Sequence, residues 1–334
     1  MPDQSRSNLR FEGQRYFRID PIPALLGSAD PALTYTVRRD LLGEKVPPVQ
    51  ELWTMKGCQR LAEKQLPNGA WRYPGKSYDP ISNTNYDLLE TYRTLRVLVE
   101  MFAFDRRHPI IEKAINYVFS CQTEEGDIRG IIGNQYMPYY HGAILELVIK
   151  AGYGEDPRVI KGLAWLVSMR QYDGGWVIPA QLVPARLKNP ALWHGQPVEP
   201  DRTKPHSHLA TGMILRAFAV HPNYIDLPEV KQAGYCLCER IFKADRYIDR
   251  KDSSYWLKFQ FPFWWTTLVT TLDTLSRLGF CSNNEQIASG LRWFAENQSA
   301  DGLWETGYGS GQRVEDNRNW VGLAICRLVK RFYE

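Results

Sequence analysis

The sequence RQYDGGW at residues 170–176 has close counterparts before and after it, QLPNGAW at 65–71 and QSADGLW at 298–304. A fourth copy, QTEEGDI at 122–128, keeps the Gln and the Gly but lacks the Trp. Each copy follows one amphipathic stretch and precedes another, so the copies mark a helix-pair repeat of roughly 50 residues. Because the repeat runs almost end to end without a change in composition, it predicts an all-α protein folded as a single closed domain.

The conserved spacing inside these turns has a mechanical interpretation. The Gly takes the left-handed conformation that ends a helix, the Asp or Asn caps the turn, and the Trp folds back over it. The Gln can then bond exposed backbone groups of a neighbouring repeat. We therefore interpret the turns as structural links between repeats and not as catalytic groups.

Prolines and polar residues mark the expected helix starts, since proline suits the first helical position, where its missing N–H has no partner. The first helices of the pairs are expected near Pro31, Asn85, Pro138, His206, Pro262 and Asn317, and the second helices near Pro48, Pro109, Pro157, Pro228 and Asn284.

Charges alternate in sign when the first helices of the last five repeats are aligned. The equivalent positions are Arg96, Glu146, Arg216, Asp273 and Arg327. If the repeats close into a ring, neighbouring charges can pair around one end of it. The alternative is a set of unrelated, solvated charges.

Composition limits the functional classes. The 334 residues carry a net charge of +4 with both signs interspersed, so we expect no nucleic-acid partner. No apolar leader or membrane-spanning run occurs, and we expect a cytoplasmic protein. The six cysteines form no Cys-x-x-Cys pair and are interpreted as reduced thiols, mostly buried, so no metal site is predicted from them. The 11 Trp and 18 Tyr exceed what the turns use and point to a cavity or an interface.

The Gln-x-x-Asp-Gly-x-Trp turn between paired helices resembles the repeat of the terpenoid cyclases and protein prenyltransferase β subunits, over about residues 30–330. One copy has Arg170 where the pattern has Gln. The chain is similar in style to the prenyltransferase/squalene oxidase repeat proteins. The resemblance implies an α/α toroid of about six inner and five to six outer helices around an apolar, aromatic-lined cavity. It divides the chain into an extension at 1–30 and a toroid domain at 31–334. The family's Asp-x-Asp-Asp, Asp-x-Cys and Asp-Asp-x-x-Asp motifs are absent.

Two links between an outer and the next inner helix are longer than the others, at about 177–205 and 243–262. In a toroid such links border the cavity mouth, and long ordered loops are often functional. We interpret them as a lid or a partner-binding surface; the alternative is an inert insertion.

Polar and aromatic residues gather at the expected inner-helix starts. Helix N-termini favour anions such as a diphosphate or a carboxylate, and aromatic faces stabilise cations. An acid that starts a cyclisation must keep its proton, which burial can achieve; Asp87 is the first candidate, followed by His141 and Asp316. The candidate substrate-binding residues are Asn83, Asn85, Tyr139, Tyr140, His206, His208, Trp264, Trp265, Arg318 and Trp320.

Each candidate has a structural alternative. Asp87 and Asp316 suit helix starts whatever their role, His141 suits a pocket wall, and the aromatic pairs suit a core. His206 and His208 could share a metal only with a third ligand. No cofactor is expected, with Mg or Zn left open.

The leading hypothesis is an isoprenoid-binding, terpenoid cyclase-like or prenyltransferase-like protein that acts on an apolar chain in the central cavity, with peripheral membrane contact as a route for collecting substrate. One alternative is a carbohydrate-active α/α-barrel lyase or hydrolase using Tyr139, Tyr140, His141 and Arg318. Another is a non-catalytic toroid that binds an apolar ligand or a protein. A closed apolar cavity favours the first, an open groove with exposed Trp faces the second, and a centre filled by the protein's own side chains the third. Catalysis, substrate and oligomeric state stay open.

Overall fold

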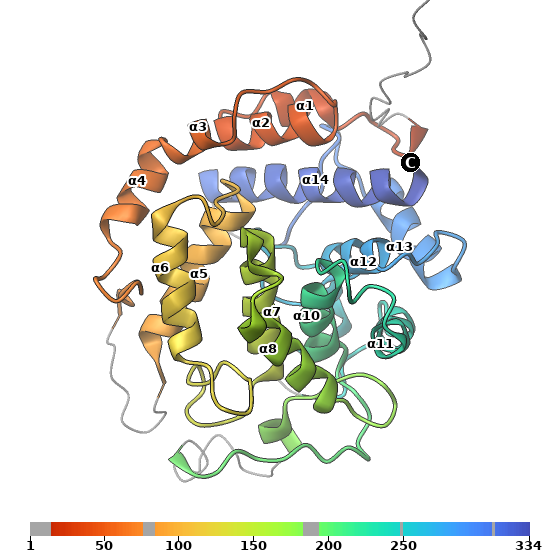
Figure 1. Cartoon of the computed structure of the whole chain (residues 1–334). Coiled ribbons are helices and arrows are strands. Elements are labelled where there is room, and N and C mark those ends of the chain that lie inside the picture. The colour runs from red at the N-terminus through yellow and green to blue at the C-terminus, as the bar shows by residue number, and fades with distance from the viewer. Residues whose placement is uncertain (1–14, 76–83, 183–193, 248–249, 309–310) are drawn as a thin grey trace, which may run out of the picture.

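The computed structural model describes residues 15–75, 84–182, 194–247, 250–308 and 311–334 (Figure 1). These residues form helices joined by loops, with isolated β-bridges and no β-strand among them. The all-α prediction is therefore confirmed. Asn83 and parts of both long loops, at 183–193 and 248–249, lie outside the described residues.

Six helices form the inner layer of a ring. They are α2 (Pro31–Asp40), α5 (Tyr86–Glu100), α7 (Pro138–Val148), α10 (His208–Ala219), α12 (Leu268–Arg277) and α14 (Gln312–Tyr333). Each of these helices contacts the next along the chain from α5 onward: α5 contacts α7, α7 contacts α10, α10 contacts α12, and α12 contacts α14. Helix α14 in turn contacts α2 (Figure 1). Every residue of α7 and α10 is buried, as expected for helices that are covered on all sides.

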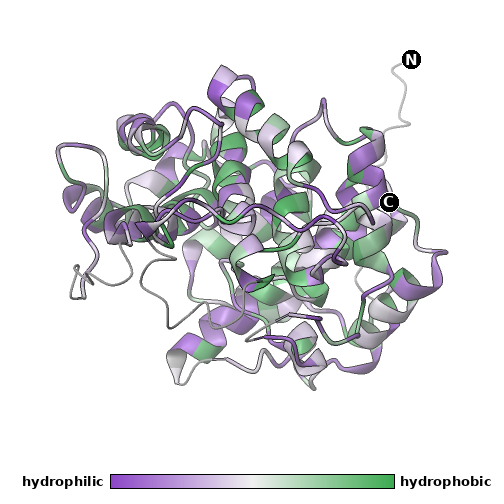
Figure 2. Ribbon diagram, turned by 90° about the horizontal axis from the view of Figure 1, so that it is seen from below, coloured by the Kyte–Doolittle hydropathy of each residue, from purple (hydrophilic) through white to green (hydrophobic). Residues whose placement is uncertain are grey.

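The outer layer consists of α4 (Lys56–Glu63), α6 (Pro109–Ser120), α8 (Pro157–Ser168), α11 (Pro228–Cys238) and α13 (Glu285–Glu296). The last four pack against the preceding inner helices, α5, α7, α10 and α12. Short elements complete the chain, namely α1 (Ile22–Leu26), α3 (Gln50–Trp53), a π-helical turn at Ile149–Tyr153 and two 3-10 turns at Pro179–Leu182 and Ser253–Leu257. Hydrophobic residues concentrate between the layers, and hydrophilic ones lie toward the outside (Figure 2).

The four repeat turns have the geometry that their sequence predicts. Gly69, Gly126, Gly174 and Gly302 all have positive φ angles, between 86° and 114°. Gln65 donates to the carbonyl of Gly69 inside its own turn at 3.0 Å and to that of Ile110 in the next repeat at 2.8 Å. Trp71 folds back and donates from its indole to Leu61 at 2.7 Å. The interpretation of the turns as links between repeats is confirmed.

Arg170, which replaces the Gln of the pattern, makes the hydrogen bond within its own turn but not the one to the backbone of the next repeat. Its Nε donates to the carbonyl of Gly174 at 2.9 Å, as a Gln amide does in the other turns. Its guanidinium then donates to the side chain of Gln232 on α11 at 2.6 Å. An Arg–Gln pair therefore replaces the direct link from Gln to the backbone of the next repeat, and the adjacent Gln171 binds the carbonyls of Asp201 and Lys204.

Most helices begin where proline or a cap predicts. Helices α2, α6, α7, α8 and α11 begin at their predicted prolines, and Asn85 and Asn284 cap α5 and α13. Two predicted starts are wrong. Helix α12 begins at Leu268 and not near Pro262, because Thr267 and Thr270 form a capping box. Helix α14 begins at Gln312, five residues before Asn317.

The described part of the N-terminal extension packs on the ring. Phe17, Ile22 and Leu25 are buried, and the Phe17 ring meets Trp304 at 5.1 Å. Gln298 of the last repeat turn donates to the carbonyl of Ile19 at 2.7 Å. The carbonyl of Ile19 thus accepts the hydrogen bond that, in the earlier turns, goes to the following repeat.

The alternating charges pair only in part. Glu146 and Arg216 form the expected ion pair, at 2.6 Å. Arg327 pairs instead with Asp40 of α2, and Arg96 donates to the backbone carbonyls of Pro262 and Phe263. The prediction is therefore right for the α7–α10 pair and wrong for Arg96, whose partner is a peptide segment inside the ring.

Candidate functional site

A peptide segment crosses the centre of the ring. We call residues 259–266 the central segment. Arg96 on α5 donates to the carbonyl of Phe263 at 2.9 Å, and Arg216 on α10 donates to that of Trp264 at 3.1 Å. On α14, Asn317 accepts from the backbone N–H of Phe261 at 2.7 Å. The segment is therefore held between three inner helices; Phe259 and Thr266 are buried, Gln260 is exposed, and the residues between them are half-buried.

The central segment contributes to an aromatic cluster formed by Tyr92, Tyr139, Tyr140, Trp264 and Trp265. The Trp264 ring lies 5.2 Å from Tyr92 and 6.0 Å from Tyr140, both edge-on. Tyr139 lies 4.4 Å from Tyr140 and 6.3 Å from Trp265, so the cluster is continuous. It brings together four of the predicted substrate-binding residues and adds Tyr92, whose position on the inner face of α5 follows the helical spacing of the apolar residues.

Three arginines cover the indole rings of the aromatic cluster. The Arg96 guanidinium carbon lies 4.6 Å from the centre of the Trp264 ring, and that of Arg250 lies 4.1 Å from Trp265. Arg93 approaches both Trp264 and Tyr73. At these distances cations are attracted to the ring faces. The aromatic cluster therefore already has cations on its faces, and a cationic ligand would compete with them.

Two polar atoms inside the cluster have no hydrogen-bond partner among the described residues. They are the hydroxyl of Tyr92 and the indole nitrogen of Trp264. Burial raises the pKa of both Tyr92 and Tyr140, in the latter case to about 12, so both phenols keep their protons at neutral pH. Arg216 lies near the Tyr92 hydroxyl and Trp264 near the Tyr140 hydroxyl, so both groups have polar neighbours inside the cluster.

Asp87 is linked to the cluster through Tyr73 and Arg93. It is half-buried in the first turn of α5, and its carboxylate accepts from the backbone N–H of Tyr73 at 3.3 Å. The Tyr73 ring lies 4.9 Å from that of Tyr86 in a tilted arrangement, and the Arg93 guanidinium lies over both Tyr73 and Trp264. Asp87 is thus connected to the aromatic cluster through Tyr73 and then through the Arg93 guanidinium.

His141 is fully buried, and both of its ring nitrogens have partners. Nδ1 accepts from the backbone N–H of Ile128 at 3.0 Å, and Nε2 lies 3.1 Å from the carbonyl of Gly162. Burial lowers the pKa of His141 to about 4. The ring links the second repeat turn to α8 and has no nitrogen left for a ligand, which matches the structural alternative for this residue.

The remaining polar candidates are held by other parts of the fold. His206 contacts Asp173 of a repeat turn at 2.9 Å, and His208 contacts Asp245 of the long loop at 3.0 Å. Asn85 caps α5, and Arg318 pairs with Asp301 at 2.9 Å. The partners of these four residues therefore all lie outside the aromatic cluster.

Within α14, Trp320 donates to the carboxylate of Asp30 at 2.9 Å and is almost fully buried. Asp316 is exposed on the same helix. The set Tyr139, Tyr140, His141 and Arg318, which a polysaccharide lyase would need in one place, is spread between the aromatic cluster, the α7–α8 contact and the last repeat turn. Within the described residues, no group of three or more His, Cys, Asp or Glu side chains could hold a metal ion.

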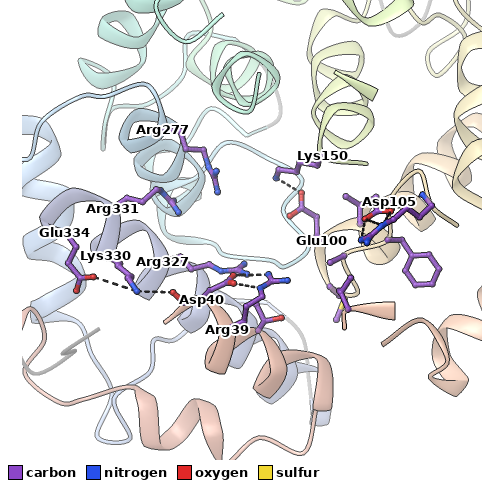
Figure 3. Close-up of a pocket in the computed structure, with 17 residues that line it drawn as sticks. Arg39, Asp40, Glu100, Asp105, Lys150, Arg277, Arg327, Lys330, Arg331 and Glu334 are labelled. Carbon is purple, nitrogen blue, oxygen red and sulfur yellow. Dashed lines mark hydrogen bonds and ion pairs between the residues drawn. The ribbon is translucent and has the colours of Figure 1, made fainter. Parts of the chain in front are cut away.

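A large pocket lies at the C-terminal ends of the inner helices, away from the aromatic cluster near their N-terminal ends. We call it the charged pocket; its volume is about 940 Å³ (Figure 3). Its charged side chains are Arg39 and Asp40 of α2, Glu100 of α5, Asp105, Arg107 and Lys150 of the following turns, Arg277 of α12, and Arg327, Lys330, Arg331 and Glu334 at the end of α14. Sequence reasoning missed this pocket, although the four-residue spacing from Asp273 to Arg277 and from Arg327 to Arg331 is a detectable signal.

No protein-family model matches the chain. The chain is 32% identical over 87 residues to a probable squalene–hopene cyclase from Sinorhizobium fredii. The match covers 26% of this chain and 13% of the length of that cyclase. The resemblance to the terpenoid cyclases is thereby confirmed at the level of local sequence.

Similar solved structures include a protein from Actinoplanes, with a TM-score of 0.44, 13% identity, and coverage of 94% of this chain and 88% of that chain. A variant of the type II terpene cyclase MstE from Scytonema has a TM-score of 0.43 and 12% identity, over 93% of this chain and 84% of that chain. A second MstE variant, in complex with its substrate geranylgeranyl dihydroxybenzoate, has a TM-score of 0.44 and 11% identity, over 93% and 85% of the two chains.

The described residues thus form an all-α ring with Gln…Gly-x-Trp turns. None of the described helices is both long and apolar enough to cross a bilayer.

Proposed function

We propose that this protein binds an isoprenoid-type apolar ligand at the aromatic cluster, as a terpenoid cyclase-like protein. The observation that carries the proposal is the cluster itself, in which Tyr139, Tyr140, Trp264 and Trp265 meet inside a helical ring. Aromatic faces of this size offer a large apolar contact to an unsaturated chain. The local sequence match to a squalene–hopene cyclase supports the same class of ligand.

Asp87 is the acid that we assign to this site if the protein is catalytic. It is connected to the cluster through Tyr73 and Arg93, whereas His141 has both nitrogens engaged and Asp316 is exposed on α14. Protonation of an alkene requires an acid that reaches the chain within hydrogen-bond distance. Asp87 would meet this condition for a ligand that lies along Tyr73 and Trp264.

A second candidate function, a non-catalytic binder, is favoured by the central segment. The segment lies between α5, α10 and α14, where a cyclase would hold its substrate, and two buried arginines hold its carbonyls in place. A ligand would then contact the aromatic cluster from the side of the loops without entering the centre. In this case the only role of Asp87 is to stabilise the first turn of α5.

The test is a thermal-shift and tryptophan-fluorescence titration with prenyl diphosphates, squalene-like hydrocarbons and oligosaccharides, each with and without Mg²⁺ or Zn²⁺. Ligand binding to the folded state raises Tm by an amount set by concentration over Kd. We expect an isoprenoid shift that Trp265→Ala weakens and Trp53→Phe preserves, because Trp53 contacts Phe104 and His108 outside the cluster.

The outcomes separate the candidates. Product formation that Asp87→Asn abolishes while binding persists would support the catalytic assignment, and binding without product from any isoprenoid would support the non-catalytic one. No response to any isoprenoid, or an equal response in Trp265→Ala, would overturn the proposal. A response to oligosaccharides alone would favour the carbohydrate-active alternative.

A further inference from the structure

The charged pocket lies at the ends of the inner helices away from the aromatic cluster, and the proposed function does not use it. Its walls come from α2, the end of α5, the turn after α7, and the ends of α12 and α14 (Figure 3). Among its lining residues are seven basic side chains and four acidic ones. The distribution of these charges, and not the count alone, indicates what the pocket accommodates.

Two carboxylates beside the pocket are each shared by two arginines. Asp40 pairs with both Arg39 and Arg327, and Asp273 pairs with both Arg277 and Arg331. Figure 3 shows Arg39 and Arg327 meeting at Asp40, with Arg277 and Arg331 on the neighbouring wall. Each shared carboxylate neutralises only one guanidinium. Two positive charges are therefore left over on adjacent walls.

The other charges that face the pocket are balanced. Lys150 lies 2.6 Å from Glu100 and 2.7 Å from Glu146, and Glu146 is in turn shared with Arg216. The remaining pairs are Arg107 with Asp105 and Lys330 with Glu334, at 2.5 and 3.8 Å. These groups contribute no excess of either sign, so the surplus belongs to the four arginines.

The surplus is not fully relieved by the protein. Burial lowers the pKa of Arg331, and the nearby cations Arg277 and Arg327 lower it further against the attraction of Asp273. The C-terminal ends of α2 and α12 offer partial negative charge that offsets part of the excess. The partial negative charge of the helix ends explains why basic residues lie here. It does not explain why an open pocket lies between them.

We propose that the charged pocket binds a small anion that carries two or more phosphate groups. Planar guanidinium groups bind phosphate oxygens in bidentate geometry, and four of them from three helices can surround such an anion. The volume lies within the roughly 300–1,000 Å³ range of small-molecule sites. The proposal is independent of the isoprenoid site, since it rests on different residues at the opposite end of the ring.

The experiment is isothermal titration calorimetry of the whole chain with pyrophosphate and with ADP, in a phosphate-free buffer of low ionic strength. The double variant Arg327→Gln/Arg331→Gln removes the two surplus charges, while Asp40 keeps Arg39 and Asp273 keeps Arg277. Folding is checked by circular dichroism and Tm, and the matched control is Arg60→Gln, an exposed arginine on α4. We expect pyrophosphate binding that the double variant weakens at least about tenfold and the control leaves unchanged.

The two arms distinguish the sources of the phosphate. Tighter binding of ADP than of pyrophosphate would assign the pocket to a nucleotide, and equal binding would assign it to the phosphate groups alone; both support the proposal. Binding that is absent in the wild type, equal in the folded double variant, or matched by citrate at the same concentration would overturn it.

Discussion

Arg216 donates from Nε to Glu146 at 2.6 Å while another of its nitrogens donates to the carbonyl of Trp264 at 3.1 Å. Both ionised side chains are about 7% exposed. The same guanidinium thus joins the ion pair between two inner helices to the central segment. Burial opposes the charge on Glu146, but Arg216 and Lys150 hold its pKa below the ordinary value.

We predict that Glu146→Gln lowers the free energy of unfolding by about 3–5 kcal/mol, because it leaves Arg216 buried without its counter-charge. The measurement is urea denaturation at neutral pH. The control is Arg38→Gln, which removes an exposed pair with Glu44 and should cost less than about 1 kcal/mol. Equal effects of the two substitutions would contradict a special role for the buried pair.

Stability should fall as the pH drops below neutrality, in part because of His141. Its pKa is about 4 in the folded state against an ordinary value of 6.5, so the unfolded chain binds its proton first. The stability is full above pH 6.5 and is lost as the pH falls toward 4. This residue alone should cost about 2 kcal/mol between pH 7 and pH 5.

His208, whose pKa burial also lowers to about 4, acts in the same direction and over the same range. The variant His141→Gln isolates the first residue, since an amide can accept from Ile128, donate to Gly162 and keep His208 unchanged. We expect its unfolding free energy to fall about 2 kcal/mol less than that of the wild type between the two pH values. Identical pH profiles would show that His141 does not change protonation on unfolding.

The turn glycines should not tolerate a side chain. Gly69 has a φ angle of 91°, and a Cβ there would lie 2.1 Å from the carbonyl oxygen of Lys113. Gly69→Ala should therefore destabilise the protein by more than about 1 kcal/mol. The matched substitution Gly57→Ala, in open space within α4, should be neutral or stabilising by up to about 1 kcal/mol. Thermal unfolding of both variants decides, and a harmless Gly69→Ala would contradict the turn geometry.

Arg170 departs from the repeat pattern without loss of its contact to Gly174. Arg170→Gln restores the residue of the other turns and should change the unfolding free energy by less than about 0.5 kcal/mol. Arg170→Ala removes the bond to the turn and the bond to Gln232, and should cost about 1–2 kcal/mol. If both variants lose the same stability, the side chain acts through Gln232 alone.

Local sequence was sufficient for the elements whose physics is local. Gly69 and Gly302 adopt the left-handed conformation that ends a helix, so each predicts a turn from its own position. Proline favours the first helical position and so predicts the helix starts at Pro109, Pro157 and Pro228. Pro262 gave a wrong start for the opposite reason. Its segment is not helical, and Arg96 and Arg216, far away along the chain, hold its carbonyls.

The same division holds for the candidate sites. Spacing along the chain predicts the helix-pair repeat, the turn geometry and the aromatic residues at the inner-helix starts, because each depends on neighbours within a few residues. Contacts between distant helices instead bring Trp264 to Tyr92 and Tyr140, enclose His141 between two backbone groups, and let four arginines share Asp40 and Asp273. These arrangements depend on which helices pack against one another in the folded chain, and no pattern within a few residues predicts that pairing.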